Sequence, residues 1–250
     1  MFDSYQDIFN QRGVAYHQAM LRYPEARRHE FALVLDAARL CPGDVVVDMP
    51  SGGGYLRDWI GTEGVEVVAI ETTQAFYDQC PERPGLQRRL SPLDQTGLPD
   101  ASADVVISLA GLHHVDDKAG VFAEVHRILQ PGGRFVAADV RAGSRVEGFL
   151  DTFVDAHNSM GHTGTFVDDG FRAALAGAGF EVARDETAAY PWVFGSADEM
   201  VDCCTLMFGL DRATPDHVRS GIAEWLGSTE ADGCEMNWEL QILVASRPAG

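Results

Sequence analysis

The stretch Val45–Leu56, VVVDMPSGGGYL, decides the fold of this chain. A run of valines ends in Asp48, and a glycine-rich loop follows immediately. Further apolar runs lie at 64–71, 103–110 and 133–140, with a weaker one at 86–90, and segments with helical spacing separate them. Strands that alternate with helices indicate a parallel sheet covered on both faces, and the continuous valine and isoleucine content fits that burial. The sequence therefore predicts an α/β fold.

The rest of the chain predicts how this fold is organised. Residues 2–40 have helical character interrupted at Pro24, and two further helices are expected between about 195 and 232, before a last strand at 235–246. Insertions late in a doubly wound sheet usually cover the carboxyl ends of the strands. We expect one domain over 1–250: a ligand-binding core at 41–140 and a helical lid from 1–40 and 192–232. The sheet is expected to be Rossmann-like, doubly wound, mostly parallel and seven-stranded.

Charge and composition exclude several classes of function. The formal net charge of −19 argues against nucleic acid or an anionic membrane as the main partner. No signal peptide is visible at the N-terminus, and no apolar run approaches the roughly 18 residues of a membrane span. The five cysteines form no CxxC pair, which fits reduced thiols in a cytoplasmic protein. The composition is typical of a G+C-rich bacterial genome, and nothing indicates an oligomeric state.

The glycine loop favours one kind of nucleotide. Gly52 and Gly54 give G-x-G, but Arg57 stands where a dinucleotide fold needs a third small residue, and no G-K-[ST] of a phosphate loop is present. Asp48 would repel a pyrophosphate and attract an ammonium or sulfonium group. Glu71 ends the second strand, where a carboxylate can accept the hydroxyls of a ribose. S-adenosylmethionine has this set of groups and no phosphate.

Four segments in order resemble one family. VVVDMPSGGG, VVAIE, LDQTGLPDASADVVISLAGLHHV and ILQPGGRFV are similar to segments of the class I S-adenosylmethionine-dependent methyltransferases. The small-molecule branch, with the ubiquinone and menaquinone biosynthesis enzymes, is the most similar. The resemblance covers roughly residues 40–140.

The resemblance implies a set of cofactor-binding residues. Asp48 and the main chain near it would hold the methionine part, Glu71 the ribose, and Asp94 the adenine amino group. One departure stands in the loop, because the family pattern has glycine where this chain has Pro50 and so loses one N–H donor. The full expected set is Asp48, Met49, Pro50, Gly52, Gly54, Glu71, Thr72, Asp94, Gln95, Leu109 and Ala110.

Candidate catalytic residues are His113 and His114 after the fourth strand, and Tyr16 on the N-terminal helix. Histidine suits acid–base work through its near-neutral pKa, and Tyr16 could close over the cofactor. A structural role for the histidine pair is an open alternative. His157 and His162 could face the substrate, but their spacing with Asp155 matches no standard set of metal ligands, so no metal is expected.

These features predict metal-independent methyl transfer from S-adenosylmethionine to a small apolar or aromatic metabolite. Which atom of the acceptor is methylated is left open. The alternative is a protein that binds the cofactor with lost or redirected activity, as a regulatory subunit or in non-methylating chemistry such as cyclisation.

Overall fold

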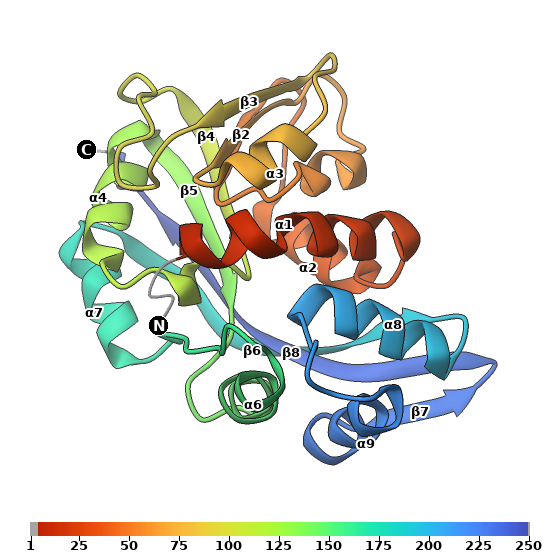
Figure 1. Ribbon diagram of the computed structural model, residues 1–250. Coiled ribbons are helices and arrows are strands. Elements are labelled where there is room, and N and C mark those ends of the chain that lie inside the picture. The colour runs from red at the N-terminus through yellow and green to blue at the C-terminus, as the bar shows by residue number, and fades with distance from the viewer. Residues whose placement is uncertain (1–4, 250) are drawn as a thin grey trace.

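The computed structural model describes residues 5–249, and these form an eight-stranded sheet with helices on both faces (Figure 1). The strand order is β3-β2-β1-β4-β5-β8-β6, with β7 paired to β8. The strands are β1 Val45–Asp48, β2 Glu66–Glu71, β3 Leu86–Leu90, β4 Ala103–Leu109, β5 Leu129–Asp139, β6 Glu181–Phe194, β7 Ser228–Ala231 and β8 Gly233–Ser246.

The Rossmann-like, mostly parallel sheet is confirmed, with one strand more than expected. Strands β1 to β5 pair in parallel, whereas β8 runs antiparallel to both β5 and β6. The additional strand, β7, has the sequence STEA and is mainly exposed, so it lacks the apolar pattern that marks the others. It lies inside the range expected for the lid and forms a short hairpin with β8.

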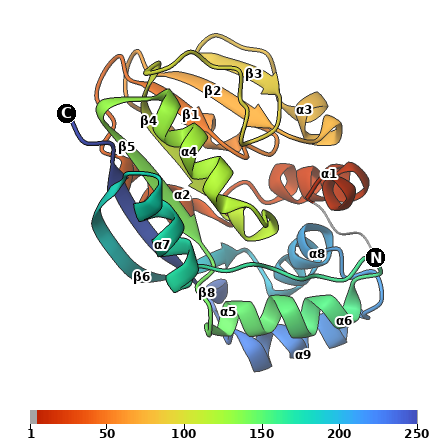
Figure 2. The ribbon, with the colours of Figure 1, turned by 90° about the vertical axis from the view of Figure 1, so that its left-hand side faces the viewer.

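Alternating residues of the central strands supply two cores. Val46 packs into the core that faces α2 (Arg28–Ala38). Val47 packs into the opposite core, with α4 (Lys118–Ile128) and α7 (Asp169–Gly177). Figure 2 shows α4 and α7 together over one face of the sheet. The shorter elements are α3 Gln74–Gln79 and the 3₁₀ turns η1 Tyr55–Trp59 and η2 Leu112–His114.

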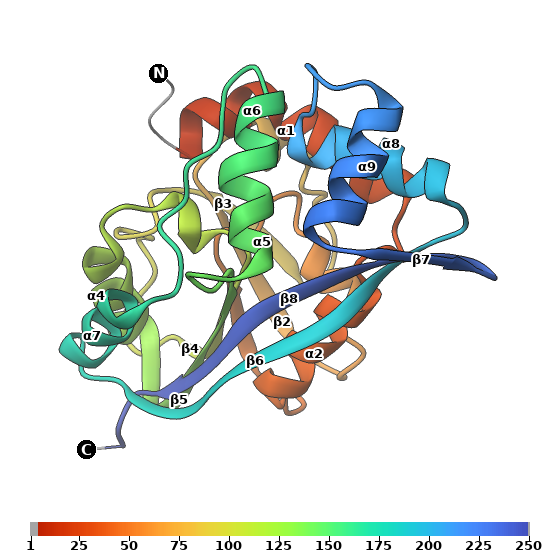
Figure 3. The same ribbon diagram turned by 90° about the horizontal axis from the view of Figure 1, so that it is seen from below.

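The lid draws on three parts of the chain. The first is α1 (Tyr5–Arg22), which ends just before Pro24; α2, expected in the lid from sequence, instead packs against the sheet. The second is α8 (Ala197–Phe208) and α9 (Pro215–Trp225), carried on the long strands β6 and β8 (Figure 3). The third was not assigned to the lid from sequence: α5 (Arg145–Gly148), the π-helical η3 (Phe149–Val154) and α6 (Asp155–His157), which lie beside α9.

The carboxyl ends of the two central strands, β1 and β4, lie side by side at the point where the strand order reverses. The order runs outward from β1 through β2 and β3 on one side and from β4 through β5 on the other. Such a switch point leaves a crevice outside the carboxyl ends of the two central strands, which is where doubly wound sheets bind ligands. Asp48 ends β1 and Leu109 ends β4. Within residues 5–249, no helix is both long and apolar enough to cross a membrane.

Candidate active site

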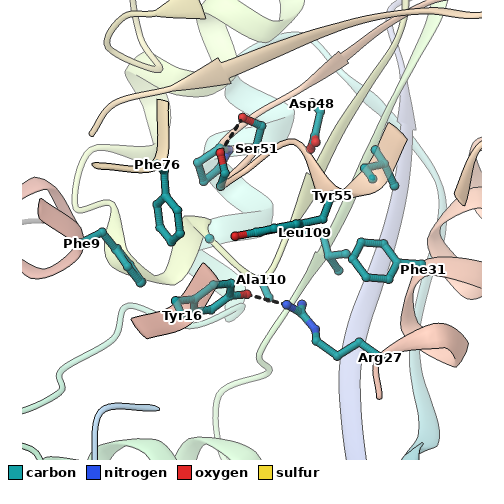
Figure 4. A pocket seen from close by; sticks show the side chains of 14 residues that line it. Phe9, Tyr16, Arg27, Phe31, Asp48, Ser51, Tyr55, Phe76, Leu109 and Ala110 are labelled. Carbon is teal, nitrogen blue, oxygen red and sulfur yellow. Dashed lines mark hydrogen bonds between the residues drawn. The ribbon is translucent and has the colours of Figure 1, made fainter. Parts of the chain in front are cut away.

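A cavity of about 520 Å³, including its open mouth, lies at the switch point, and we call it the glycine-loop cavity (Figure 4). Its volume falls in the range of small-molecule sites. It is lined by Phe9, Tyr16, Arg27, Phe31, Asp48, Pro50, Ser51, Gly52, Tyr55, Leu56, Phe76, Leu109, Ala110 and Gly111. Five of these were expected to bind the cofactor: Asp48, Pro50, Gly52, Leu109 and Ala110.

Asp48 is a buried carboxylate that faces this cavity. Its residue is 3% exposed, and within the described chain no hydrogen-bond donor or cation pairs with its carboxylate oxygens. Burial raises the pKa of Asp48 well above its usual value, and the nearby Glu71 raises it further. A buried carboxylate is costly unless something pairs with it. The cavity therefore selects a ligand that brings positive charge or donors to Asp48.

Glu71 braces the glycine loop from the end of β2. Its Oε1 accepts the N–H groups of Thr72 at 2.7 Å and Thr73 at 3.0 Å, and its Oε2 accepts that of Gly52 at 2.9 Å. Burial raises the pKa of Glu71, although these N–H groups act to lower it. The carboxylate thus joins the loop after β1 to the end of β2. Its expected contact with a ribose stays a prediction.

Two expected loop residues are used within the protein. The Met49 N–H donates to the Ile107 carbonyl at 2.9 Å, and the Gly54 N–H donates to the Ser51 carbonyl at 3.0 Å. Neither residue lines the cavity, so contacts with a ligand through these two N–H groups are not available. Gly54 has a φ of 74°, and a Cβ there would lie 2.6 Å from the Cys80 sulfur. Its glycine serves the turn and its packing.

Two of the other residues expected to bind the cofactor line a separate open cleft, which we call the outer cleft. Thr72 and Asp94 line this outer cleft together with Gln6, Pro92, Leu93, His114, Val115, Asp116, Asp117 and Val121. Asp94 is exposed. Gln95 is exposed as well and lines none of these cavities. Thr72 and Asp94, expected on the adenine side, thus line a different cavity from Asp48.

A second cavity, of about 570 Å³ including its open mouth, lies beneath the lid, and we call it the lid cavity. It shares Phe9, Tyr16, Arg27 and Ala110 with the glycine-loop cavity, so the two are neighbours with a common wall. Its remaining lining combines apolar and aromatic side chains with an arginine, a glutamate and three histidines: Arg12, Glu30, His113, His114, Val140, Leu150, Val154, His162, Trp192, Met207, Phe208 and Trp238.

The common wall contains a buried ion pair. Arg27 and Glu30 are 5% and 1% exposed, and the Arg27 Nε donates to Glu30 Oε1 at 2.9 Å. The second Glu30 oxygen accepts from the Tyr190 hydroxyl and the Trp192 indole N–H, each at 2.9 Å. Sequence reasoning missed this pair, because its partners come from β6, far along the chain.

Tyr16 lines both cavities, and Figure 4 shows it beside Arg27 in the glycine-loop cavity. Its hydroxyl accepts from Arg27 Nη1 at 2.5 Å, which leaves its own O–H to donate elsewhere. Burial raises the pKa of Tyr16, although Arg27 acts to lower it. Tyr16 is thus a neutral donor at the place where two ligands would meet. The neighbouring His17 bonds the Tyr55 hydroxyl at 2.9 Å and so joins α1 to the glycine loop.

His113 and His114 line the lid cavity. His113 Nδ1 lies 2.6 Å from Asp139 Oδ1, and both residues are buried. Burial alone would raise the pKa of Asp139, but contact with His113 and two backbone N–H groups lower it below its usual value. Burial lowers the pKa of His114 well below its usual value, and the neighbouring His113 and His162 lower it further. His114 is therefore a neutral imidazole in this environment.

Comparisons with known proteins bear on this site. Residues 47–137 match the family model described as a methyltransferase domain. A "Probable S-adenosylmethionine-dependent methyltransferase" of Mycolicibacterium smegmatis is 34% identical over 113 residues, which cover 45% of this chain and 44% of that protein. A demethylmenaquinone methyltransferase of Renibacterium salmoninarum is 32% identical, covering 43% and 46%. The matching part thus spans less than half the length of either relative.

A solved structure matches nearly the whole chain. It belongs to the "Complex between the Haloferax volcanii Trm112 methyltransferase activator and the putative methyltransferase", with a TM-score of 0.66, 21% sequence identity and 98% of both chains covered. At this identity the likeness concerns the fold. S-adenosylmethionine is the cofactor expected of the matched family. Residues 47–137 are therefore similar to a methyltransferase domain, and nearly the whole chain shares the fold of that solved structure.

Proposed function

We propose that this protein transfers the methyl group of S-adenosylmethionine to a small apolar or aromatic acceptor that carries one ionisable polar group. The unpaired Asp48 carboxylate in the glycine-loop cavity supports this proposal most directly. It needs a cationic or donor-rich partner, and the methionine part of this cofactor has both an ammonium and a sulfonium group.

The residues present fit the cofactor. Asp48 would pair with the methionine end, and Pro50, Gly52, Leu109 and Ala110 would line it. Thr72 and Asp94, in the outer cleft, would take the adenosine end. Pro50 lines the cavity without closing it. The cofactor brings an activated methyl group, so the chain mainly has to hold the acceptor in line with it.

The lid cavity fits the acceptor. It adjoins the glycine-loop cavity at Tyr16 and Ala110, so a molecule inside it lies beside the expected position of the methyl group. Apolar walls with a few polar groups are typical of small-molecule sites. The walls include Trp192, Phe208 and Trp238, and ring contacts join these three. Such walls select a flat or hydrocarbon-rich acceptor.

The polar end of the lid cavity suits an acidic acceptor atom. His113, held through Nδ1 by Asp139, presents its other nitrogen as a hydrogen-bond acceptor. An imidazole in that state can take a proton from a hydroxyl or acidic C–H group as the methyl is transferred. Tyr16 can donate a hydrogen bond to a ligand at the common wall. His113 and His114 are thus proposed as the acid–base residues and Tyr16 as the positioning donor.

Calorimetric titration with S-adenosylmethionine, S-adenosylhomocysteine and NADH tests the cofactor. Binding of the two adenosyl ligands alone, weakened in Asp48→Asn and unchanged in the exposed control Asp58→Asn, is expected. A folded wild type that binds neither adenosyl ligand would refute the proposal.

A panel of phenols, aromatic acids and long-chain enols, followed by mass spectrometry for a gained methyl group, tests the acceptor. A protein that binds the cofactor tightly and methylates no member of a wide panel would favour the regulatory or non-methylating alternative.

A further inference from the structure

Three histidines converge at the polar end of the lid cavity. His113 and His114 come from η2, and His162 comes from the loop after α6. One ring nitrogen of each lies within 4.8 Å of the corresponding nitrogens of the other two. All three side chains line the lid cavity. We call His113, His114 and His162 the histidine cluster.

Carboxylates orient two members of the cluster. His113 Nδ1 lies 2.6 Å from Asp139 Oδ1, and His162 Nδ1 lies 2.7 Å from Asp151 Oδ1. A carboxylate can only accept, so the proton of each pair sits on Nδ1 and the Nε2 lone pair faces away from the acid. Metal-binding histidines almost always have such a second partner, which fixes the tautomer and makes the ligating nitrogen more basic.

The backbone holds the same groups in place. The His113 N–H donates to Asp139 Oδ2 at 3.1 Å, and the His162 N–H donates to Asp155 Oδ1 at 2.9 Å. Asp151 lies in the π-helical segment η3, a rare helix type that is frequent at functional sites. The cluster is therefore braced from β5, from η2 and from the lid.

Charged side chains of both signs lie around the cluster. Asp139 and Asp151 supply two negative charges in direct contact with the imidazoles. Arg12 and Lys118 supply positive charge near His114, and Arg12 does so near His162 as well. The Arg12 guanidinium also donates a 2.7 Å hydrogen bond to the Met207 carbonyl. The two acids match these two cations in number, so the case for an ion rests on the geometry of the imidazoles.

We infer that the histidine cluster is a mononuclear site for a divalent first-row transition ion such as Zn²⁺, with an open coordination position that faces the lid cavity. Three imidazoles suit zinc and its neighbours, and catalytic zinc sites combine three protein ligands with one exchangeable position. Zinc–nitrogen bonds of about 2.0–2.1 Å place ligand nitrogens roughly 3.3 Å apart, so the rings draw in by about 1–1.5 Å on binding.

The ion gives the site a definite role toward the acceptor, and this part rests on the proposed function. An oxygen or sulfur of the acceptor would take the open position, where the ion would lower its pKa so that its proton could pass to water. With His113 and His114 bound to the ion, the ion would replace these histidines in the acid–base role proposed for them. This replaces the sequence-based expectation of a metal-independent enzyme. That expectation depended on spacing along the chain, and His162 joins the cluster only in the folded protein.

The test uses tag-free, chelator-treated protein titrated with Zn²⁺ in a calorimeter and with Co²⁺ in a visible spectrophotometer. One equivalent of each ion is expected to bind, with the intense visible bands of low-coordinate Co²⁺. His162→Asn should abolish the spectrum and weaken Zn²⁺ binding. Asp151→Asn, which keeps all three ligands, should weaken binding by about 10- to 100-fold.

His157→Asn is the matched control. His157 lies on the adjoining helix and bonds the Phe153 carbonyl at 2.7 Å, outside the cluster. This variant should bind both ions like the wild type, and circular dichroism confirms the fold of each variant.

Absence of stoichiometric binding by folded wild type, or equal binding by a folded His162→Asn variant, overturns the inference and identifies any residual signal as adventitious. S-adenosylmethionine binding, measured in parallel on the same samples, separates this failure from a failure of the proposed function.

Discussion

Replacing Asp48 by Asn tests two effects of its buried charge: the loss of protein stability and the gain in cofactor binding. The change keeps the shape of the side chain and removes its charge. Because the carboxylate is 3% exposed and no donor of the described chain pairs with it, the charge is a burden to the ligand-free protein. The same charge is proposed to attract the methionine end of the cofactor. We therefore expect the variant to be more stable and to bind the cofactor more weakly.

The magnitudes follow from the burial. Leaving a buried polar group unpaired costs on the order of 1–3 kcal/mol, and more for a charge. The Asn amide stays unpaired, so the variant is relieved only of the additional cost of the charge, and each kcal/mol of this relief should raise the Tm by roughly 2–4 °C in a chain of this size. A hydrogen bond to a charged group contributes about 1.5–3 kcal/mol. Its loss should raise the Kd for S-adenosylmethionine by roughly 10- to 150-fold.

The pH dependence has a definite sign. The pKa of Asp48 in the folded protein lies well above the usual 3.8, so the folded wild type binds more protons than the unfolded chain between these two values. The wild type therefore loses stability as the pH rises through that window, and Asp48→Asn does not. The difference in Tm between variant and wild type should grow with rising pH and level off above the raised pKa.

Glu71→Gln is the matched control, measured by thermal unfolding from pH 5 to pH 8 and by calorimetry. The Glu71 carboxylate accepts three backbone N–H groups, so an amide in its place turns an NH₂ toward donors and should destabilise the protein by about 1–3 kcal/mol. Opposite signs for the two variants are the expected result. An Asp48→Asn protein that is less stable than the wild type at pH 7.5, or that keeps full cofactor affinity, refutes the reasoning.

Three further predictions concern packing, charge and thiols. Gly111→Ala puts a Cβ 2.3 Å from the Pro50 ring, so the loop has to shift, and thermal unfolding and calorimetry should show a loss of roughly 1–3 kcal/mol with weaker cofactor binding. Glu30→Gln leaves Arg27 buried without its counter-charge, and urea unfolding should show a loss of about 3–5 kcal/mol; an unchanged midpoint would contradict the buried pair. Cys41 is exposed and the other four thiols are buried, so a thiol reagent should label one group rapidly in the folded protein and none in Cys41→Ser.

The sequence was sufficient to predict those strands that are buried along their whole length. Strands β1, β2 and β4 are continuous apolar runs because both of their faces are covered, and Asp48 stands out against that background. Thr72 and Asp94 line the outer cleft together, and their contact with an adenine stays a prediction. These features depend on local pattern, which a single sequence displays.

The rest depends on contacts between distant segments. His162 meets His113 through a loop whose path no periodicity encodes, and Glu30 finds its partners on β6. Gln95 was expected near the adenine because of its neighbour Asp94, yet it lines none of the three cavities discussed. A short exposed strand such as β7 has no apolar face to reveal it.

Because the two cavities share a wall, entry and release of both proposed ligands would depend on one helix, α1. Phe9 and Tyr16 lie on α1 and line the glycine-loop cavity and the lid cavity alike. Movement of α1 away from α3 and α8, against which it packs, would open both cavities at once. Closure would then align donor and acceptor together, and release of either product would wait for the same motion. Lid opening of this kind, rather than bond making, limits the turnover of many enzymes.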